Sequence, residues 1–235
     1  MLLGIVADIH CNVGGLRQAL DRMGPVDQLL CAGDAIYQFR FSNEVIELLR
    51  ERDARYILGN HELTFLSPDG ARARSAPTVR ADNLEYMASQ PTSIDVLVNG
   101  RRLVMAHGSP FRPYDTYVYP TSPILFRMSE LGADYVILGH THHAMALQVG
   151  RTLVINPGAA GDPRDLGNGL DLSYAVLDTA SGEVRFESYP DPARPGELQM
   201  PGRTGEWPVR GVAPSQSNGL QSHHSGTLPP WIREV

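Results

Sequence analysis

The first sixty residues alternate short apolar runs with amphipathic segments, a pattern typical of parallel strands connected by helices. The apolar runs predict strands over residues 2–7, 28–32 and 55–58. Apolar residues recur at helical spacing in 13–23 and 43–52, so both segments are predicted helices, and Asn12 can cap the first of them. Each predicted strand ends in a cluster of polar residues. This half of the chain therefore predicts a sheet of parallel strands covered by helices.

The remainder of the chain predicts mainly hairpins. Strands over 93–98 and 101–106 flank Asn99-Gly100, a pair that favours a type I′ turn because both residues tolerate positive φ. Further strands are predicted over 134–138, 144–149, 152–156, 174–178 and 183–189, with helices over 79–89 and 124–131. Antiparallel pairing should thus dominate the second half. Together the two halves predict an α/β domain that spans residues 1–189.

The composition changes from residue 190 onward. Proline and glycine supply 14 of the last 46 residues, and few long apolar side chains are present. Such a segment buries too little apolar surface to offset the entropy lost on ordering. We therefore expect residues 190–235 to form a Pro/Gly-rich tail that is either flexible or docked on the domain through Trp207 and Trp231.

Composition and charge narrow the classes of function. The chain has 235 residues, is 42% hydrophobic and carries a net charge of −6, so it has no global field that would attract nucleic acid or an anionic membrane. All basic residues are arginine, which excludes lysine Schiff-base chemistry and a Walker-type phosphate lysine. With two cysteines, no signal-like start and no long apolar run, we expect a cytoplasmic protein without a membrane span.

The informative chemistry follows the predicted strands. Oxygen and nitrogen donors stand just beyond five of them: Asp8, His10, Asp34, Asn60, His61, His107, His140 and His142. Ligands collect at the carboxyl ends of strands in open α/β sheets, so these donors can meet at one rim. Carboxylate, amide and imidazole groups bind divalent Mn, Fe, Zn or Co. The number of donors is too large for a single ion and fits two ions that share one carboxylate.

The ordered set Asp8-x-His10, Gly33-Asp34, Gly59-Asn60-His61-Glu62, His107 and Gly139-His140-x-His142 resembles the motifs of the calcineurin-like metallophosphoesterase superfamily. The resemblance covers residues 2–189 and is greatest for small single-domain bacterial and archaeal phosphodiesterases. It implies a four-layer α/β/β/α sandwich of two mixed β-sheets flanked by helices. It also implies a dinuclear metal-dependent hydrolase of phosphoesters, with Mn or Fe favoured over Zn, Co or Ni.

The resemblance further implies a role for each motif residue. One metal would be bound by Asp8, His10, Asp34 and His142, and the other by Asp34, Asn60, His107 and His140. Asp34 would bridge the ions, a hydroxide between them would attack phosphorus in line, and Asn60 would help to stabilise the developing charge. His61 would contact the phosphate or protonate the leaving oxygen without binding metal. Asn12 and Arg164 are weaker candidates for contact with the substrate.

The sequence leaves the substrate open. The compact chain without a capping domain favours phosphodiesters, while phosphomonoesters of small molecules or proteins are the alternative. A non-catalytic scaffold on the same fold, like the retromer subunit of this superfamily, would be favoured by missing motif residues, but every position is filled. A nuclease of structured nucleic acid needs a basic track, and this acidic chain without lysine offers at most a local arginine patch. We therefore expect a small-molecule phosphoester, with nucleic acid as the less favoured substrate. Tyr114, Tyr117 and Tyr119 fit either the core or a substrate rim, and the oligomeric state stays undetermined.

Overall fold

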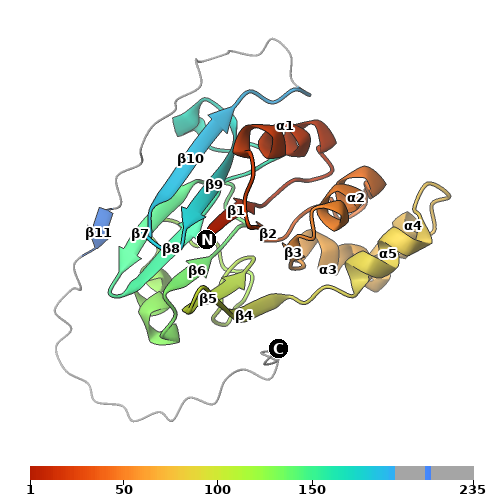
Figure 1. The fold of residues 1–235 in the computed structure, drawn as a ribbon. Coiled ribbons are helices and arrows are strands. Elements are labelled where there is room, and N and C mark those ends of the chain that lie inside the picture. Colours follow the sequence, from red (N-terminus) through yellow and green to blue (C-terminus); the bar gives the residue numbers. More distant parts are fainter. Residues whose placement is uncertain (194–209, 213–235) are drawn as a thin grey trace.

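The structure, a computed structural model, describes residues 1–193 and 210–212 (Figure 1). Most of the predicted tail, including Trp207 and Trp231, lies outside the described residues. Within the described tail, β11 (Arg210–Val212) pairs in parallel with strand β7 (Met145–Val149). In the described part of the chain, no helix is long and apolar enough to cross a membrane.

Two mixed β-sheets form the centre of the fold. The first has the order β10-β9-β1-β2-β3, and its strands are β1 (Leu2–Val6), β2 (Gln28–Cys31), β3 (Arg55–Tyr56), β9 (Leu172–Asp178) and β10 (Val184–Tyr189). The second has the order β11-β7-β8-β6-β5-β4, and it adds β4 (Ser93–Val98), β5 (Arg101–Ala106), β6 (Tyr135–Ile137) and β8 (Thr152–Asn156). In each sheet three neighbouring strands, β1-β2-β3 and β5-β6-β8, run parallel.

Helices cover the outer faces of both sheets. The α-helices are α1 (Val13–Met23), α2 (Asn43–Glu51), α3 (Asn60–Leu66), α4 (Ala71–Arg74) and α5 (Ala81–Ala88). Three 3-10 helices, η1 (Pro68–Gly70), η2 (Pro123–Leu131) and η3 (Leu166–Asn168), complete the described helices. Figure 1 shows α1 and α2 on the side of the first sheet that faces away from β5 and β6.

Three buried apolar clusters show the four layers. Leu16 and Ile46 belong to the cluster in which α1 and α2 pack on the first sheet. Ile5 and Ile137 lie in the cluster between the two sheets. A third cluster contains Met128 of η2 and lies on the outer face of the second sheet. The α/β/β/α sandwich expected from the sequence is confirmed.

The predicted strands are all present, with small shifts at their ends, and Asn99 and Gly100 adopt the positive φ that a type I′ turn requires. The segment predicted as an α-helix over 124–131 is instead the 3-10 helix η2. Leu125, Met128 and Leu131 recur every three residues, which is the period of a 3-10 helix. Antiparallel hairpins are confirmed in the second half, but β6 is parallel to both of its neighbours.

Candidate metal centre

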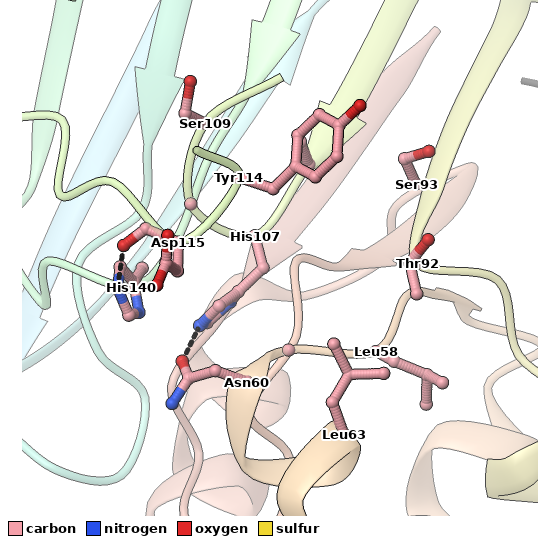
Figure 2. Close-up of a pocket in the computed structure, with 13 residues that line it drawn as sticks. Leu58, Asn60, Leu63, Thr92, Ser93, His107, Ser109, Tyr114, Asp115 and His140 are labelled. Atoms are coloured by element: carbon pink, nitrogen blue, oxygen red, sulfur yellow. Dashed lines mark hydrogen bonds between the residues drawn. The ribbon is translucent and has the colours of Figure 1, made fainter. Parts of the chain in front are cut away.

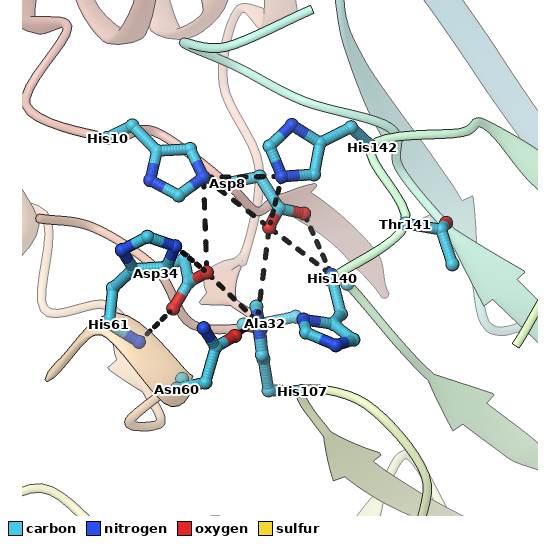
Figure 3. Close-up of polar contacts among 12 residues, drawn as sticks. Asp8, His10, Ala32, Asp34, Asn60, His61, His107, His140, Thr141 and His142 are labelled. Atoms are coloured by element: carbon cyan, nitrogen blue, oxygen red, sulfur yellow. Dashed lines mark hydrogen bonds and ion pairs between the residues drawn. The ribbon is translucent and has the colours of Figure 1, made fainter. Parts of the chain in front are cut away.

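The side chains singled out after the predicted strands converge at one edge of the sandwich (Figure 3). Asp8 and His10 follow β1, and Asp34 follows β2. The second sheet contributes His107 after β5, and the loop after β6 carries His140 and His142. Asn60 and His61 form the first turn of α3, a short helix that the sequence did not predict. The site therefore spans both sheets, because the carboxyl ends of their parallel strands meet there.

The backbone at this edge is unusual. Asp8, His10, Asp34, His140 and His142 all have positive φ, between 48° and 70°. Residues other than glycine seldom adopt this left-handed conformation, although Asp and His do so more often than most. Left-handed turns at both members of Asp8-x-His10 and of His140-x-His142 bring the side chains of each pair together.

Two groups of donors lie side by side. In the first, Asp8, His10 and His142 place their ligand atoms within 4.8 Å of one another, and His142 Nε2 lies 3.4 Å from Asp8 Oδ1. In the second, the ligand atoms of Asp34, His107 and His140 also lie within 4.8 Å of one another, and His107 Nε2 lies 3.1 Å from Asp34 Oδ2. Each group can hold a divalent cation.

Further contacts extend and connect the two groups. Asn60 Oδ1 lies 3.1 Å from His107 Nε2, which adds the amide to the second group. Asp34 Oδ2 lies 3.9 Å from His10 Nε2, so this carboxylate stands between the groups. His61 Nε2 is 3.7 Å from the same oxygen, and His10, Asp34 and His61 form a third set with ligand distances. Distance alone therefore does not separate His61 from the ligands.

Burial keeps most of these histidines neutral. It lowers the pKa of His10 to about 3 and those of His140 and His142 to about 4, because a charged imidazolium is poorly solvated there. Neutral imidazole is the form that binds a metal. His107 differs: burial acts to lower its pKa, but the Asp34 carboxylate raises it to about 10. Without a metal, His107 is therefore protonated and forms an ion pair with the Asp34 carboxylate. A metal cation bound by both side chains would take the place of this proton.

Backbone carbonyls fix the ring orientation of three histidines. His107 Nδ1 donates to the Ala32 carbonyl at 2.7 Å, and His140 Nε2 donates to the Asp115 carbonyl at 3.0 Å. His142 Nδ1 likewise donates to the Asp162 carbonyl. Since a carbonyl only accepts, each contact fixes the proton on that nitrogen and leaves the other nitrogen for the cluster. This arrangement is typical of histidines that bind metal.

Glu62 belongs to the motif that the sequence pointed to, but the sequence reasoning gave it no role. Its side chain is fully buried and accepts hydrogen bonds from the backbone N–H groups of Gly59 at 2.7 Å, Asp34 at 3.0 Å and Ile36 at 2.9 Å. The carboxylate thereby ties the loop after β2 to the start of α3. A side chain at Gly59 would collide with Asp34 Oδ1, which explains the glycine. Glutamate at the third position of a helix is a capping signal and could have identified this role.

The two weaker candidates have different surroundings. Asn12 caps α1, and its amide donates to the Gly161 carbonyl and to Asp191, so its side chain is engaged in holding loops together. Arg164 is half-exposed at the rim, where Asp162 pairs with it at 2.7 Å.

Tyrosines border the cluster on two sides. Tyr37 stacks on His10 with ring centroids 4.4 Å apart, and Tyr117 stacks on His140 at 3.9 Å. Tyr117 and Tyr119 are nearly half-exposed, which places them at the rim and not in the core. The sequence left this choice open for the tyrosine-rich loop.

Comparison with known proteins agrees with this geometry. Residues 1–182 match the model of the calcineurin-like phosphoesterase superfamily domain, and the chain belongs to that family. Among solved structures, a metallophosphoesterase from Sphaerobacter thermophilus is similar, with a TM-score of 0.63, 26% identity, and coverage of 80% of this chain and 88% of its own.

Two further relatives are more distant. An uncharacterised protein from Methanocaldococcus jannaschii is 24% identical over 213 residues, which cover 79% of this chain and 86% of that protein. A structure described as a novel archaeal phosphodiesterase has a TM-score of 0.54 and 24% identity, over 80% of this chain and 100% of its own. At that identity the second match shows the shared fold alone.

Proposed function

We propose that this protein is a dinuclear metal-dependent phosphoesterase that acts on phosphodiesters. The observation that carries the proposal is the pair of buried oxygen and nitrogen donor groups with Asp34 between them. Asp8, His10, Asp34 and His142 would hold one cation, and Asp34, Asn60, His107 and His140 the other. Neutral imidazoles and carboxylates without any thiolate suit Mn or Fe, and they also accept Zn, Co or Ni.

Two such cations would neutralise phosphate charge and lower the pKa of a water between them, which supplies a nucleophile at neutral pH. The protein's contribution is to hold its donors in place before the substrate arrives. Carbonyl contacts orient the rings of His107, His140 and His142, and Glu62 holds the loops that carry Asp34 and Asn60. Preorganised charges of this kind stabilise the transition state without further rearrangement.

His61 is placed to donate a hydrogen bond. The Gln38 backbone N–H donates to His61 Nδ1 at 3.1 Å, so this nitrogen is unprotonated and Nε2 carries the hydrogen of the neutral ring. Nε2 faces the Asp34 carboxylate within the cluster. We therefore assign His61 to a hydrogen bond from Nε2 to the phosphate, on the side of the leaving oxygen. Arg164 lies half-exposed at the rim, where a phosphate oxygen would compete with the Asp162 carboxylate for its guanidinium group.

The alternatives are a phosphomonoesterase and a non-catalytic scaffold. All seven proposed ligands are present and directed at the cluster, which favours a metal enzyme over a scaffold. The test is to load the purified protein with Mn, Fe, Zn, Co or Ni, quantify bound metal, and assay 4-nitrophenyl phosphate against bis(4-nitrophenyl) phosphate.

About two metals per chain with faster diester hydrolysis would support the proposal. Faster monoester hydrolysis would assign a phosphomonoesterase instead. Two bound metals without turnover of any phosphoester would contradict the proposal of an enzyme. If no metal binds, the proposal of a metal centre is contradicted as well.

A further inference from the structure

An apolar pocket opens beside the second donor group (Figure 2). We define it by four wall residues, Leu58, Leu63, Ala106 and Tyr114, and it has a volume of about 280 Å³. These four residues come from the loop after β3, from α3, from the end of β5 and from the loop after it. None of the four is a proposed metal ligand.

The pocket is built from well-connected backbone. The Leu58 N–H donates to the Pro91 carbonyl at 2.8 Å, which ties the loop after β3 to the residues before β4. Ser93 at the start of β4 is in register with Ala106 at the end of β5. The Ser109 N–H donates to the Tyr114 carbonyl at 2.8 Å and closes the loop that carries this tyrosine. The pocket is therefore preformed at the junction of the two sheets.

One edge of the pocket is made by Asn60, His107 and His140, the residues proposed to bind the second cation. A group in the pocket would thus lie next to a phosphate at the metals. His61 does not line the pocket, and its ring packs instead against His10 on the other side of Asp34. The leaving oxygen, on whose side His61 would donate its hydrogen bond, therefore points away from the pocket.

The charge of the lining restricts what the pocket can hold. Among the described residues that line it there is no arginine, and Asp115 is the single acidic one. Arg40 and Arg164 lie with other sets of residues, on the side of the cluster near His10 and His142. Apart from His107 and the cation proposed at that edge, a second phosphate or a carboxylate would find no cationic partner among these lining residues. An uncharged apolar group would lose contact with water at no such cost.

These observations lead to an inference that rests on the proposed function and deepens it. We infer that the apolar pocket binds the ester substituent that stays on phosphorus, so that the substrate is a phosphodiester with one uncharged, mainly apolar substituent. Hydrolysis adds water across the other P–O bond: hydroxide bonds to phosphorus, the leaving oxygen takes a proton, and the phosphomonoester of the apolar alcohol is released.

Binding of two stable phosphonates tests the pocket without turnover. We would measure the Kd of methylphosphonate and phenylphosphonate by calorimetry on the full-length, Mn-loaded protein. Each buried methylene contributes about fourfold to affinity, so partial burial of the phenyl ring predicts about 30-fold tighter binding of phenylphosphonate. Leu63→Asp should bring the ratio close to one. Leu97→Asp is the matched control, because Leu97 is 74% exposed on β4 and does not line the pocket.

Kinetics then assigns the occupant. Methyl and phenyl 4-nitrophenyl phosphate share a leaving group and differ in the retained substituent, so kcat/KM should favour the phenyl diester by about the same 30-fold. The inference is overturned if Leu63→Asp keeps the wild-type ratio, if both diesters react equally, or if neither phosphonate binds. Tight phenylphosphonate binding without hydrolysis of any ester would instead contradict the proposed function and leave the pocket assignment supported.

Discussion

Replacement of the buried Glu62 carboxylate should destabilise the protein strongly. In Glu62→Ala, the backbone N–H groups of Asp34, Ile36 and Gly59 lose their shared acceptor inside the fold. A buried donor left without a partner costs about 1–3 kcal/mol, so three of them cost about 6 kcal/mol. The same substitution removes the cost of burying the carboxyl group, which offsets part of this loss.

The offset follows from the pKa of Glu62. Burial, with a further contribution from Asp34, raises this pKa from 4.5 to about 7. The shift means that the folded protein disfavours the ionised carboxylate, relative to its protonated form, by about 3 kcal/mol. The expected net loss in Glu62→Ala is therefore about 3 kcal/mol of unfolding free energy. Glu62→Gln keeps the shape and one acceptor oxygen, so it should lose about half as much.

Urea unfolding of the metal-free protein at pH 7.5 measures this loss. Glu51→Ala is the control, because Glu51 is exposed at the end of α2. A metal titration on the folded fraction should also show weaker binding in Glu62→Ala, since the loop that carries Asp34 loses its anchor. Equal unfolding free energies for Glu62→Ala and Glu51→Ala, within about 0.5 kcal/mol, would refute the role assigned to this carboxylate.

Three other variants test the site. Asp34→Asn should abolish activity and the binding of both ions together. This effect is larger than the about 10- to 100-fold loss of metal affinity that is typical when a residue beside a ligand is replaced. Full metal content by elemental analysis would contradict the bridging role. His61→Ala should keep both metals and lower kcat by about 10²–10⁴-fold, whereas loss of metal would make His61 a ligand. Burial lowers the pKa of His142 from 6.5 in the unfolded chain to about 4, so its contribution to stability is present above pH 6.5 and is lost as the pH falls towards 4. Urea unfolding of the metal-free proteins measures this effect. Between pH 7 and pH 4, the unfolding free energy of His142→Gln should fall by about 3 kcal/mol less than that of the wild type, and identical profiles would refute this assignment.

Local pattern was sufficient to predict most of the fold. The strands are short and apolar, and their ends carry polar clusters, so periodicity located them to within a few residues. Helix α3 was missed because its first turn consists of site residues, Asn60 and His61, which follow a glycine and read as a loop. The 3-10 form of η2 was missed because a three-residue apolar spacing is easily taken for part of a helical one.

Sequence order predicted which side chains meet, but not how they are held. At Asp8 the left-handed backbone is accompanied by a hydrogen bond from its N–H to the Gly33 carbonyl, which lies far from it in the chain. The carbonyl partners of the histidines come from other loops, such as Ala32 for His107 and Asp115 for His140. The apolar pocket is likewise invisible in the sequence, since its lining is assembled from four separate parts of the chain, residues 58–63, 92–93, 106–115 and 140.

Because the site spans both sheets, each metal of the proposed centre would cross-link the two halves of the domain. Asp8 and Asp34 belong to the first sheet, whereas His107, His140 and His142 belong to the second. An ion held by both sets binds only when the sheets are packed together, so metal affinity and cohesion of the sandwich become one equilibrium. At a free metal concentration of 100 times Kd, each independent ion adds about 2.7 kcal/mol to the apparent unfolding free energy. The concentration of the ion would then set how firmly the two sheets stay closed.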